Sequence, residues 1–565
     1  NDDMLKQLPE YNQVILQLLY NRGIKEKKQI EKFINPDFTK DIYDPFLFTE
    51  MERAVELIIK HIKAQNKIYI FGDYDADGVT ATTVLFETLD TLKAKADVYI
   101  PDRVSEGYGL NKKAIKYIRS EGARLMITVD NGIRNKDEIA YAEQKGLEVI
   151  VTDHHVGPDD SEDLPKCAII NPILDHESYP YRYLSGVGVS LKLASALIKK
   201  SKLGIQDKEK LIAQLLDLVA IGTIADCVDL REENRVITMR GLEMLNKTKR
   251  LGLKELIKVA KLNEYNKLDS WNIAFQIAPR LNAAGRMEHA NAAFELLITK
   301  NKEEAETMAR RLNSKNSERQ RITEEIVTEV EKQVKEDQKL IIGICPSDTQ
   351  AEAWNEGVIG LVAGRIADKY YRPTLIITKA DEGYKGSGRT IEELNIIESL
   401  EEVSKYLEKY GGHAGACGFS VKKKNFQKFI SDFKAIVNKK LEGIELKPKI
   451  IIDTEVDLEI IDEELMGEIN KLAPFGQNNE KPKFVSRNIQ IMDIFHMGIG
   501  GKHIKLRLKS ERSGALDAIG FSQAEIWEDL TIGDIIDIVY FLEFNEFNGR
   551  RSIQMKIIDI KNHSL

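Results

Sequence analysis

Cysteine is scarce in this chain of 565 residues. The four cysteines are Cys167, Cys227, Cys345 and Cys417, and no two of them form a Cys-x-x-Cys pair. Their wide spacing argues against a zinc ribbon and against a disulfide scaffold, since both need cysteines in close groups. The pattern is typical of a protein in a reducing, intracellular compartment.

The chain also lacks a long uninterrupted apolar run and a recognisable signal peptide. A helix that crosses a bilayer needs about 20 consecutive apolar residues, and a secretory leader needs a basic segment followed by a short apolar core. We therefore expect a cytoplasmic protein without a membrane partner.

An excess of basic charge is missing as well. Lys and Arg number 82 against 90 Asp and Glu, which gives a formal net charge of −8. This balance argues against a protein coated with basic charge, but a nucleic-acid binder needs only one local basic groove. What the chain does have is 42% hydrophobic residues beside 30% charged ones, which is enough to bury real cores. At roughly 150 residues per domain, the length predicts three or four domains.

Residues 67–155 alternate short β-rich runs with helical stretches. The runs "KIYIF", "ADVYI", "RLMITV" and "LEVIV" are separated by "VTATTVLFETLDTL", "KKAIKYIRSEG" and "KDEIAYAEQKG". Alternating segments of these lengths predict right-handed βαβ units around a buried parallel sheet.

Several of these expected strands end in acidic residues, and a further acid follows the apolar helix-like run "LLDLVAIGTIAD". The residues concerned are Asp73, Asp75, Asp130, Asp153, His154 and Asp226. Parallel topology would bring them to one edge of one sheet. Any single acid after a strand is more often a helix N-cap than a ligand. Their joint arrival at one edge nevertheless predicts a metal site built from several carboxylates.

The ligand types indicate the metal and the chemistry. Carboxylates with an imidazole suit Mn²⁺ or Mg²⁺, whereas a structural Zn²⁺ would favour thiolates. Five or more ligands are enough for two ions that share a carboxylate. Such a pair generates hydroxide near neutral pH and stabilises the attacking and leaving oxygens of a phosphoryl displacement. A phosphoester or phosphoanhydride is therefore the predicted substrate class.

The later part of the chain changes pattern twice. Residues 301–339 are charged and lack proline and glycine, which predicts a helix that connects two lobes. Beyond it, "KLIIGIC", "TLIITKA" and "GACGFSV" predict a second α/β domain. From about residue 450 the short runs are typical of a small β-barrel such as an OB fold. These runs are "KIIIDTEVDL", "KFVSRNIQIMDIF", "HIKLRLKS", "LDAIGF", "IIDIVYFLEF" and "RRSIQMKIIDI".

One of these runs has a basic face. Period-two alternation puts polar and apolar side chains of the segment on opposite sides. The basic side is formed by His503, Lys505, Arg507 and Lys509, and the apolar side by Ile504, Leu506 and Leu508. An ordinary amphipathic strand with a solvated basic face would look the same. The otherwise acidic chain favours a face that contacts DNA.

Four short motifs resemble, in order, those of the DHH phosphoesterase superfamily: "GDYDADG", "VDNG", "TDHH" and "GTIADCVDL". Longer stretches resemble the RecJ family of bacterial single-strand-specific 5′→3′ exonucleases. They are "EGYGL" (106–110), "PRLNAAGRM" (279–287), "WNEGVIGLVAGRI" (354–366), "GSGRT" (386–390), "GGHAGACGF" (411–419) and "PFGQNNEKPKF" (474–484). The resemblance covers nearly the whole chain, roughly from Ile15 onward.

The resemblance implies a set of metal ligands. The positions that fall where the family's ligands fall are Asp73, Asp75, Asp130, His154 and Asp226. In this interpretation Asp130 bridges two ions, Mn²⁺ or Mg²⁺. The side chains of Asp75, His154 and Asp226 would complete the shell of one ion, and Asp73 would serve the other.

Three neighbouring positions are interpreted differently. His155 is expected to face substrate phosphate or to orient the site, so the catalytic set is Asp130, His154 and His155. Asp77 is either a turn acid that caps the following helix or a residue that supports the ligands from behind. Phe71 departs from the family, which often has a histidine there, and this departure makes the ligand count of the outer metal uncertain.

A second set of residues is expected to bind the polymer. Ser387 and Arg389 lie in "GSGRT", which we interpret as a glycine-rich turn able to hold a phosphate. His413 is placed on a second glycine-flanked turn, as in the DHH-associated domain. By the family's pattern, Arg103 and Arg280 face the same cleft. For any one arginine alone, a surface ion pair would be the better interpretation.

Two glycine-containing motifs fit less well. "GVGVS" (186–190) lacks the third glycine of a dinucleotide-binding fingerprint and does not open the first βα unit, so we interpret it as a tight turn into the helix "LKLASAL". The sequence "PFGQNNEKPKF" departs from the family's more usual Gly-Asn-Pro centre, which affects the expected turn geometry and not catalysis.

The expected fold is α/β: a parallel-sheet DHH lobe and a second α/β DHH-associated lobe joined by a long helix, with a C-terminal OB-like β-barrel. The predicted segments are 1–45 (N-terminal helical), 46–240 (DHH catalytic), 241–335 (helical region and connecting helix), 336–447 (DHH-associated) and 448–565 (OB-like, nucleic-acid-binding).

The resemblance implies a metal-dependent exonuclease that degrades single-stranded DNA from the 5′ end to mononucleotides in DNA repair and recombination. A helicase and a single-strand-binding protein are expected partners, and a monomer is the expected state. Two alternatives stay open: a phosphoesterase of the same superfamily that acts on oligonucleotides, cyclic dinucleotides or pyrophosphate, and a catalytically inactive DNA-binding relative. The long helix and the terminal barrel argue against the first, and the intact acid set argues against the second.

Overall fold

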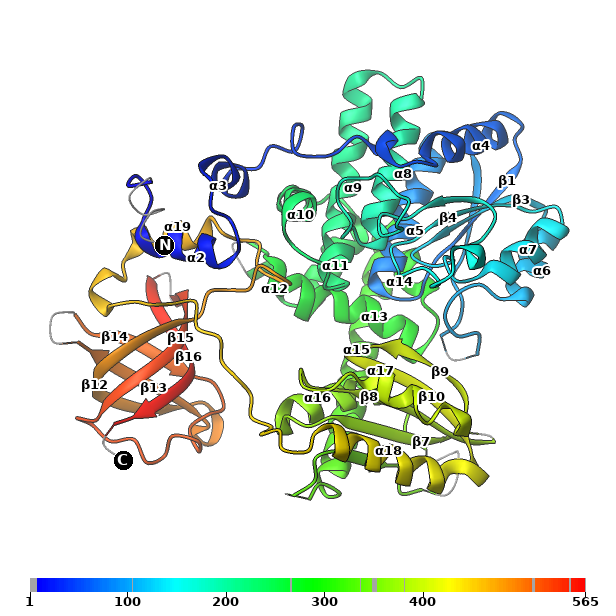
Figure 1. The fold of residues 1–565 in the computed structure, drawn as a ribbon. Helices are drawn as coiled ribbons and strands as arrows, with labels where there is room; N and C mark the ends of the chain where they lie inside the picture. Colours follow the sequence, from blue (N-terminus) through cyan, green and yellow to red (C-terminus); the bar gives the residue numbers. More distant parts are fainter. Residues whose placement is uncertain are drawn as a thin grey trace.

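The computed structural model describes residues 8–103, 105–264, 267–335, 337–347, 353–380, 382–510, 514–547 and 550–563. Figure 1 shows two α/β lobes stacked on each other and a separate C-terminal β-domain beside them. We call the lobe of residues 51–298 the first lobe and the lobe of residues 341–440 the second lobe.

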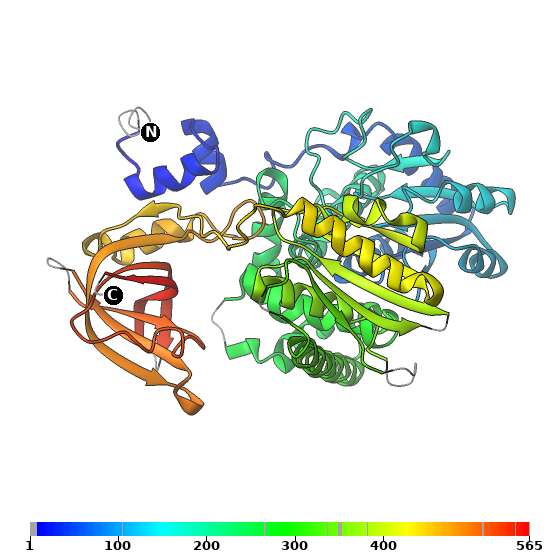
Figure 2. The same cartoon turned by 60° about the horizontal axis from the view of Figure 1, so that its bottom comes forward.

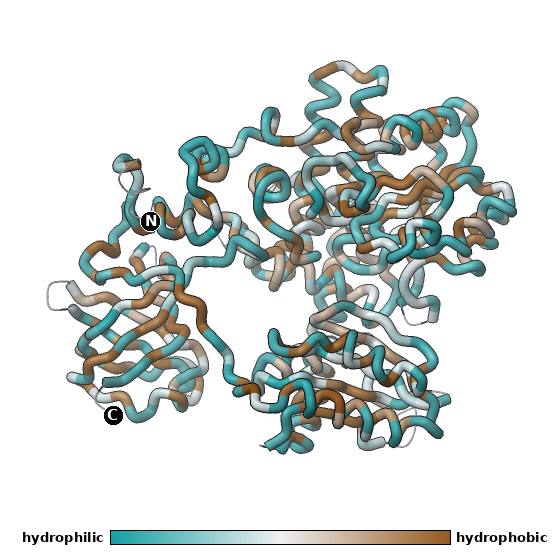
Figure 3. The backbone as a smooth tube through the Cα atoms, in the orientation of Figure 1, coloured by the Kyte–Doolittle hydropathy of each residue, from teal (hydrophilic) through white to brown (hydrophobic). Residues whose placement is uncertain are grey.

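The first lobe is organised around a parallel sheet with strand order β2-β1-β3-β4-β5. The strands are β1 (Lys67–Phe71), β2 (Lys95–Tyr99), β3 (Ala123–Val129), β4 (Glu148–Thr152) and β5 (Ala168–Ile170). Most of them run brown in Figure 3, as expected for strands that are covered on both faces. The predicted βαβ alternation and buried parallel sheet are confirmed.

Helices cover both faces of this sheet. Ile68 and Ile70 of β1 point into a core with α4 (Met51–Lys63), α5 (Ala76–Thr91) and α8 (Gly186–Lys200). Tyr69 and Phe71 point the other way, into a core with α6 (Lys112–Ser120) and α7 (Lys136–Gln144). Phe71, the position at which the family often has histidine, is therefore a core residue, and its ring stacks on Tyr99 at 5.5 Å.

A helical region follows the sheet. Its elements are α9 (Ile205–Ala225), α10 (Glu232–Leu245), α11 (Leu251–Val259), α12 (Ser270–Asn272), the π-helical turn η4 (Ile273–Ile277), α13 (Ala278–Met287) and α14 (Asn291–Ile298). The predicted connecting helix is α15 (Lys302–Glu331), which packs on α11, α13 and α14 and then on α16 (Ile359–Tyr370) of the second lobe. The long helix between two lobes is thus confirmed.

The second lobe contains a mixed sheet with strand order β6-β7-β8-β10-β9. The elements are β6 (Ile341–Ile344), α16 (Ile359–Tyr370), β7 (Thr374–Ala380), β8 (Gly383–Arg389), α17 (Ile396–Glu401), β9 (Leu407–His413), β10 (Ala416–Lys422) and α18 (Phe426–Lys440). Only β6 and β7 run parallel, and the other pairs are antiparallel. The second α/β domain predicted from sequence is confirmed.

The interpretation of "GSGRT" as a turn is wrong. Ser387 and Arg389 lie on β8, which is paired on both sides, with β7 and with β10. The glycines of this strand make room for neighbouring side chains, because a Cβ at Gly386 would collide with the ring of Phe419. His413 is likewise the last residue of β9 and precedes the turn at Ala414 rather than lying on it.

The C-terminal β-domain has strand order β11-β12-β13-β14-β16-β15, and an additional β12–β15 pairing closes it into a barrel. Its strands are β11 (Thr454–Glu455), β12 (Phe484–Met497), β13 (His503–Lys509), β14 (Leu516–Gly520), β15 (Ile535–Phe547) and β16 (Arg550–Asn562). Only two residues of the predicted strand "KIIIDTEVDL" are in strand conformation, so that prediction is largely wrong. The alternation in β13 is confirmed, because Ile504, Leu506 and Leu508 are buried.

The N-terminal helices pack on this domain. Residues from α2 (Gln13–Asn21) and α3 (Lys27–Ile34) share one hydrophobic core with α19 (Glu463–Asn470) and the barrel strands. Figure 2 shows these helices beside the β-domain and apart from the first lobe. The predicted domain boundaries stay a prediction, but the first and last segments of the chain share a core.

Within the described residues, none of the helices is both long enough and apolar enough to cross a bilayer.

Candidate active site

Acidic and imidazole side chains gather beyond the carboxyl ends of three parallel strands of the first lobe. They are Asp73 and Asp75 after β1, Asp130 after β3, Asp153, His154 and His155 after β4, and Asp226 at the end of α9. Three sets of three residues could each hold an ion, because the ligand atoms within a set lie no more than 4.8 Å apart. The sets are Asp73 with Asp75 and Asp130, Asp77 with His154 and Asp226, and Asp130 with His154 and His155. The topology thus brings together all five positions proposed as metal ligands.

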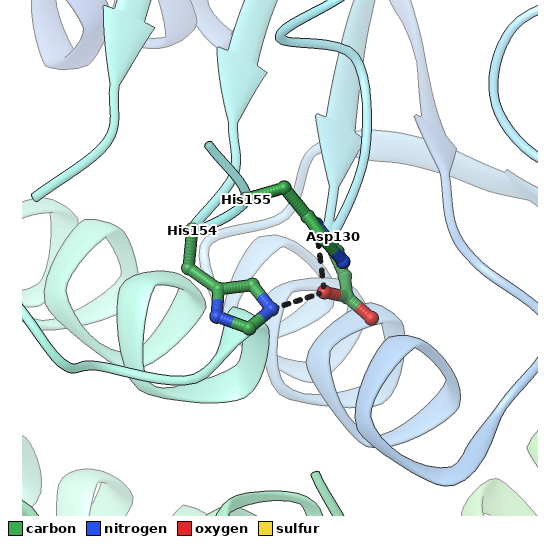
Figure 4. A group of neighbouring side chains, drawn as sticks. All are labelled: Asp130, His154 and His155. Atoms are coloured by element: carbon green, nitrogen blue, oxygen red, sulfur yellow. Dashed lines mark ion pairs between the residues drawn. The ribbon is translucent and has the colours of Figure 1, made fainter. Parts of the chain in front are cut away.

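Polar atoms of the cluster lie close together, but several of them do not form hydrogen bonds. His154 Nε2 lies 3.1 Å from Asp130 Oδ1 and 3.5 Å from Asp226 Oδ2, and Figure 4 shows the two histidines directed at Asp130. Among the described residues, Asp73 Oδ1, Asp130 Oδ1 and His154 Nε2 are buried without a hydrogen-bond partner. Buried polar atoms without partners are costly, so these atoms fit a site made for a cation.

Burial and mutual repulsion perturb the titration of these groups. Burial raises the pKa of the Asp130 carboxyl well above its usual range, and the charges of Asp77 and Asp75 raise it further. The same causes raise the pKa of Asp226. Burial lowers the pKa of His154 to about 4, and the neighbouring His155 adds to the effect. Divalent cations would offset this repulsion, and a neutral imidazole is the form that binds metal.

Asp75 and Asp77 have different partners although they are two residues apart. Asp75 is the N-cap of α5, and its Oδ1 accepts hydrogen bonds from the amides of Asp77 and Gly78, both at 3.0 Å. Asp77 therefore does not cap this helix. Its carboxylate accepts from Gly186 N at 2.7 Å and Val187 N at 3.0 Å, which ties α5 to the first turn of α8. Burial and the charge of Asp75 raise the pKa of Asp77 to about 7.

The "GVGVS" motif forms this first turn of α8. The helix begins at Gly186, with Ser185 as its N-cap, so the prediction of a tight turn before the helix is wrong. A Cβ at Gly186 would lie 2.5 Å from Asp130 Oδ1. Asp130 itself has a φ of 62°, in the left-handed region that aspartate tolerates better than most residues. Glycine at 186 is therefore what lets the helix start against the acid cluster.

Asp153, like Asp77, is hydrogen-bonded through both of its carboxylate oxygens. Its Oδ2 accepts from Ile133 N at 3.0 Å, and its Oδ1 accepts from the backbone amides of His154 and His155 and lies 2.7 Å from His155 Nδ1. Burial raises its pKa, but the bond and charge of His155 outweigh burial and lower the pKa overall. Asp153 thus orients His155 as a permanent carboxylate, a role that no sequence pattern had indicated.

Tyr108, in the "EGYGL" motif, was also missed as an individual residue. Its hydroxyl donates to the carbonyl of Asp130 at 3.3 Å and lies 3.1 Å from His155 Nδ1. The two rings meet edge to face at 5.6 Å. The motif can be identified from the sequence, but the contact between its tyrosine and His155 depends on the fold.

A row of arginines lies where the two lobes meet. The arginine row consists of Arg103, Arg280, Arg286, Arg319 and Arg389. No ion pair joins any of them to a carboxylate in the part of the chain that the structure describes. Burial lowers the pKa of Arg286 to about 9, and repulsion from Arg103 and Arg319 adds to this. Such a run of desolvated cations fits a polyanion.

Individual contacts place the row between the lobes. The Arg103 guanidinium stacks over Tyr74, between Asp73 and Asp75, at 4.7 Å from the ring centre. Arg286 Nη1 donates to Gly357 O of the second lobe at 2.9 Å. The motif that contains Arg286 was recognised from sequence, but Arg286 itself was not singled out. No sequence pattern distinguishes Arg319 as a binding residue, because it lies in the charged helix α15 among many solvated residues.

Ser387 and Arg389 face the first turn of α16. A Cβ at Gly360 would lie 3.1 Å from Ser387 Oγ and 3.9 Å from Arg389 Nη2. A helix N-terminus with a hydroxyl and a guanidinium beside it has the groups that bind phosphate. His413 is exposed at the end of β9, and its Nδ1 accepts from Gly415 N at 3.2 Å. No hydrogen bond or ion pair of the described residues joins His413 to Ser387, to Arg389 or to the first turn of α16.

Comparisons with known proteins agree with this geometry. Family models match a DHH family N-terminal domain at residues 67–223, a DHHA1 domain at 337–439 and a RecJ OB domain at 452–559. The single-stranded-DNA-specific exonuclease RecJ of Bacillus subtilis (strain 168) is 38% identical over 570 residues, which cover 99% of this chain and 70% of that protein.

Two further relatives extend the likeness. RecJ of Haemophilus influenzae is 34% identical, over 97% of this chain and 96% of that protein. The crystal structure of RecJ from Thermus thermophilus in complex with Mn²⁺ has a TM-score of 0.81 and 25% identity, covering 98% of this chain and 76% of that one. The predicted α/β fold with two lobes and an OB-like domain is confirmed. The chain that carries this acid cluster and arginine row belongs to the RecJ family of DHH proteins.

Proposed function

We propose that this chain is a metal-dependent exonuclease that hydrolyses single-stranded DNA from the 5′ end and releases 5′-mononucleotides. One observation carries the proposal: a buried cluster of carboxylates and imidazole, with unpartnered ligand atoms, adjoins a row of arginines that lack carboxylate partners among the described residues. The cluster suits divalent cations and the row suits a phosphodiester chain. The relatives named above are themselves single-stranded-DNA-specific exonucleases.

The ions that this cluster suits are Mn²⁺ or Mg²⁺, two of them, held by Asp73, Asp75, Asp130, His154 and Asp226. When bound, such ions supply a hydroxide near neutral pH and stabilise charge on the reacting oxygens. The Asp77 carboxylate is the sixth candidate, because its ligand atom lies with those of His154 and Asp226.

The protein groups around the cluster position the substrate. Asp153 holds His155 at Nδ1, which fixes the orientation of the imidazole ring and favours its protonated form. Burial lowers the pKa of His155, but the Asp153 hydrogen bond and charge raise it overall. A protonated His155 would donate to a phosphate oxygen. The edge-to-face ring of Tyr108, whose hydroxyl lies 3.1 Å from the same Nδ1, would help to hold the imidazole in place. The arginine row would bind the phosphates of the strand next to the metal ions.

The groups around the first turn of α16 would set the direction of degradation. Ser387 Oγ, the Arg389 guanidinium and the first turn of α16 would hold a terminal 5′-phosphate. The charge of Arg103 acts on both Arg389 and Asp73, so it would lie between the terminal phosphate and the scissile bond. This arrangement supports the assignment of Arg103, Ser387 and Arg389 to the strand end. His413 stays a predicted contributor without a contact that supports it.

The C-terminal β-domain is proposed to hold strand that lies outside the active site. The basic side of β13 supports this role: Arg507 and Lys509 are exposed on it, whereas Lys505 is paired with Asp517 at 2.8 Å. OB folds bind single strands through basic grooves and exposed rings. The cytoplasmic location stays a prediction. A helicase, a single-strand-binding protein and a monomeric state stay predictions.

End-labelled single strands test the proposed function directly. With Mn²⁺, a 5′-labelled strand should release labelled mononucleotide at the first time points, and a 3′-labelled strand should shorten progressively. Duplex DNA, pyrophosphate and cyclic dinucleotides serve as alternative substrates. Faster hydrolysis of a small phosphoester, or release of the 3′ label first, would contradict the proposal.

A further inference from the structure

The segment that follows α19 joins the β-domain to the first lobe. We call residues 471–480 the junction loop and residues 226–231, between α9 and α10, the Asp226 loop. Side chains of α19 belong to the core of the β-domain. Figure 1 shows the chain after α19 reaching α12 of the first lobe, where Ser270 Oγ donates to Phe475 O at 2.6 Å. The junction loop is therefore a part of the β-domain that contacts the first lobe.

Three kinds of contact join the junction loop to the Asp226 loop. The backbone amide of Leu230 donates to Gln477 O at 3.0 Å. The side-chain amide of Asn478 donates to Asp229 Oδ2 at 3.0 Å. The two loops also pack closely, because a Cβ at Gly476 would lie 2.5 Å from Leu230 Cδ1. The chain that leaves the acid cluster is thus fastened to the β-domain.

Asp229 is the fixed point of the Asp226 loop. It is buried, and its Oδ1 accepts from the backbone amide of Arg231 and from Nε of the same residue, both at 2.9 Å. Its carbonyl accepts from Tyr181 Oη at 3.1 Å and from Asn234 Nδ2 at 2.9 Å. Of these partners of Asp229, Asn478 alone belongs to the junction loop. The hydrogen bond between Asn478 and Asp229 therefore links this fixed point to the β-domain.

Asp226 depends on the backbone for its position. It is the C-cap of α9, and among the described residues no hydrogen bond reaches its carboxylate. Its nearest charged neighbour is His154, at 3.5 Å, which is a fellow candidate ligand. The next residue, Cys227, has a φ of 56°, so the chain turns away from the helix directly after Asp226. The direction of this carboxylate is therefore set by the end of α9 and by the loop that Asp229 fixes.

The junction loop is rigid enough to act as a support. Asn479 Nδ2 donates to Leu472 O at 2.9 Å and to Pro474 O at 2.8 Å, which closes the loop on itself. Asn479 Oδ1 accepts from Arg22 Nε of α2 at 2.8 Å, and Arg235 Nη1 of α10 donates to Leu472 O at 2.8 Å. Bonds within the loop and to two helices thus fix the backbone that presents Asn478.

We propose that Asn478 and Asp229 are positioning residues that hold the Asp226 carboxylate in place as a metal ligand. The proposal rests on the proposed function and gives the β-domain a part in building the metal site. Groups that support a metal ligand from behind change metal affinity or activity about 10- to 100-fold when they are removed. The centre of "PFGQNNEKPKF", which departs from the family's more usual Gly-Asn-Pro, then bears on the metal site as well as on turn geometry.

The variant Asn478→Gly removes the side-chain amide and spares the backbone, because glycine accepts the left-handed φ of 59° at this position. We would titrate Mn²⁺ into the metal-free, full-length protein by calorimetry. Wild type should bind two ions, and the variant should bind one of them about 10- to 100-fold more weakly. The Mn²⁺ concentration that gives half-maximal kcat on a saturating single strand should rise by a similar factor, with an unchanged KM for the strand.

A swap of the two side chains provides a sharper test. Asn478→Asp should weaken Mn²⁺ binding at least as much as Asn478→Gly, because it sets two carboxylates against each other. The double variant Asp229→Asn/Asn478→Asp exchanges donor and acceptor at constant net charge, and it should recover most of the affinity. The matched control is Ser270→Ala, which removes another hydrogen bond of the same junction loop and should bind Mn²⁺ as wild type does.

Two results would overturn the positioning role. The first is wild-type Mn²⁺ affinity in a folded Asn478→Gly protein. The second is an equal loss of affinity in Asn478→Gly and Ser270→Ala, since general docking of the junction loop would then be the cause. Circular dichroism checks folding. If Asn478→Gly does not fold, the swap decides, and a double variant no better than Asn478→Asp would contradict the role.

The same experiments separate this role from the proposed function. Calorimetry uses no DNA, so it reports on the metal site alone. A wild-type protein that binds Mn²⁺ but does not cleave single strands would contradict the proposed function. Weakened Mn²⁺ binding by Asn478→Gly in that protein would still support the positioning role.

Discussion

The acid cluster and the arginine row differ in sign but share an unusual property. Each places like charges together in a buried setting, and within the described residues no salt bridge between a carboxylate and a lysine or arginine involves either group. Elsewhere in the first lobe the chain pairs its buried charges: Arg250 Nη2 donates to Glu87 Oε2 at 2.8 Å, and Arg250 Nε donates to Asp217 Oδ1 at 3.0 Å. Paired charges are structural, whereas unpaired ones need ligands of opposite sign.

The opposite signs of the two groups indicate which ligand each one would bind. Cations would satisfy the acid cluster, and phosphates would satisfy the arginine row. A metal-bound phosphodiester strand is the one ligand that spans both sites. Substitutions in the two sites should therefore impair different steps, metal binding in the first and strand binding in the second.

The largest effect is expected at Asp130, the carboxylate common to two of the possible metal sets. The variant Asp130→Asn keeps the shape of the side chain but removes the charge that would bridge two ions. Cleavage should fall about 1,000-fold or more, because the nucleophile and the charge stabilisation are lost together. Steady-state release of mononucleotides in Mn²⁺ measures it.

The control for this variant is Asp207→Asn, an acid in the first turn of α9 away from the cluster. It should cleave normally. Near-normal turnover of a folded Asp130→Asn enzyme would contradict the assignment of the cluster as the catalytic centre.

The second effect is expected in the arginine row. The variant Arg389→Ala should lose about 2–3 kcal/mol of binding to a 5′-phosphorylated strand, the size of a charge-assisted contact plus an unpaired phosphate. The loss should shrink on a strand with a 5′-hydroxyl. Affinities of both strands for wild type and variant measure it, and an equal loss on both strands would mean that Arg389 does not hold the terminal phosphate.

A third, smaller effect concerns pH. The carboxyls of Asp77 and Asp130 have pKa values raised by burial, that of Asp77 to about 7. Because the unfolded chain loses these protons at lower pH than the folded one, stability without metal should fall as pH rises from about 4 to 7. The lowered pKa of His154 acts in the opposite direction over the same window, and we expect a net loss of about 1–2 kcal/mol.

Thermal unfolding in chelator and in Mn²⁺ across a pH range of about 5 to 8 measures this effect. The stabilisation by Mn²⁺ should grow with pH, since the metal replaces protons. The variant Asp130→Asn, with one charge fewer, should show a flatter pH dependence without metal. A metal-free protein whose stability rises through this window would contradict the repulsion assigned to the cluster.

The smallest effect is expected in the β-domain. Arg507→Ala and Lys509→Ala should each reduce the slope of log affinity against log salt by about 0.7 on long single strands, the contribution of one phosphate contact. Substitutions are preferable to deletion of the domain, since α2 and α3 share its core. An unchanged slope in the double variant would mean that this face is the solvated side of an amphipathic strand.

The acid cluster could be predicted from the sequence because strand order and strand ends are topological properties. Parallel strands end at one edge, so Asp73, Asp130 and His154 could be placed together without side-chain detail. The roles of Asp75 and Asp77 could not be separated in this way. The two residues lie only two positions apart at the start of α5. Only the position of α8 decides which of them accepts hydrogen bonds from the amides of Gly186 and Val187.

The error at Ser387 and Arg389 has a similar cause. Glycines at 386 and 388 favour a turn by local preference, but here they leave space for Phe419 and Cys417 of the neighbouring strand. Pairing on both sides then holds the segment extended. Arg319 could not be found from local sequence, since what distinguishes it is the lack of a carboxylate partner among the described residues. The place of Asp153 at the sheet edge could be predicted, but its hydrogen bonds with His155 and Ile133 N, which set its role, could not.

Calorimetric titration of Mn²⁺ into the metal-free protein at mildly alkaline pH tests the central claim most directly. Wild type should bind two ions per chain, and Asp153→Asn, which alters the acid that holds His155, should keep the same stoichiometry. Asp130→Asn should lose at least one ion and bind the rest far more weakly. Undiminished binding of two ions by Asp130→Asn, or no binding by wild type, would contradict the claim that the buried acid cluster is a metal centre.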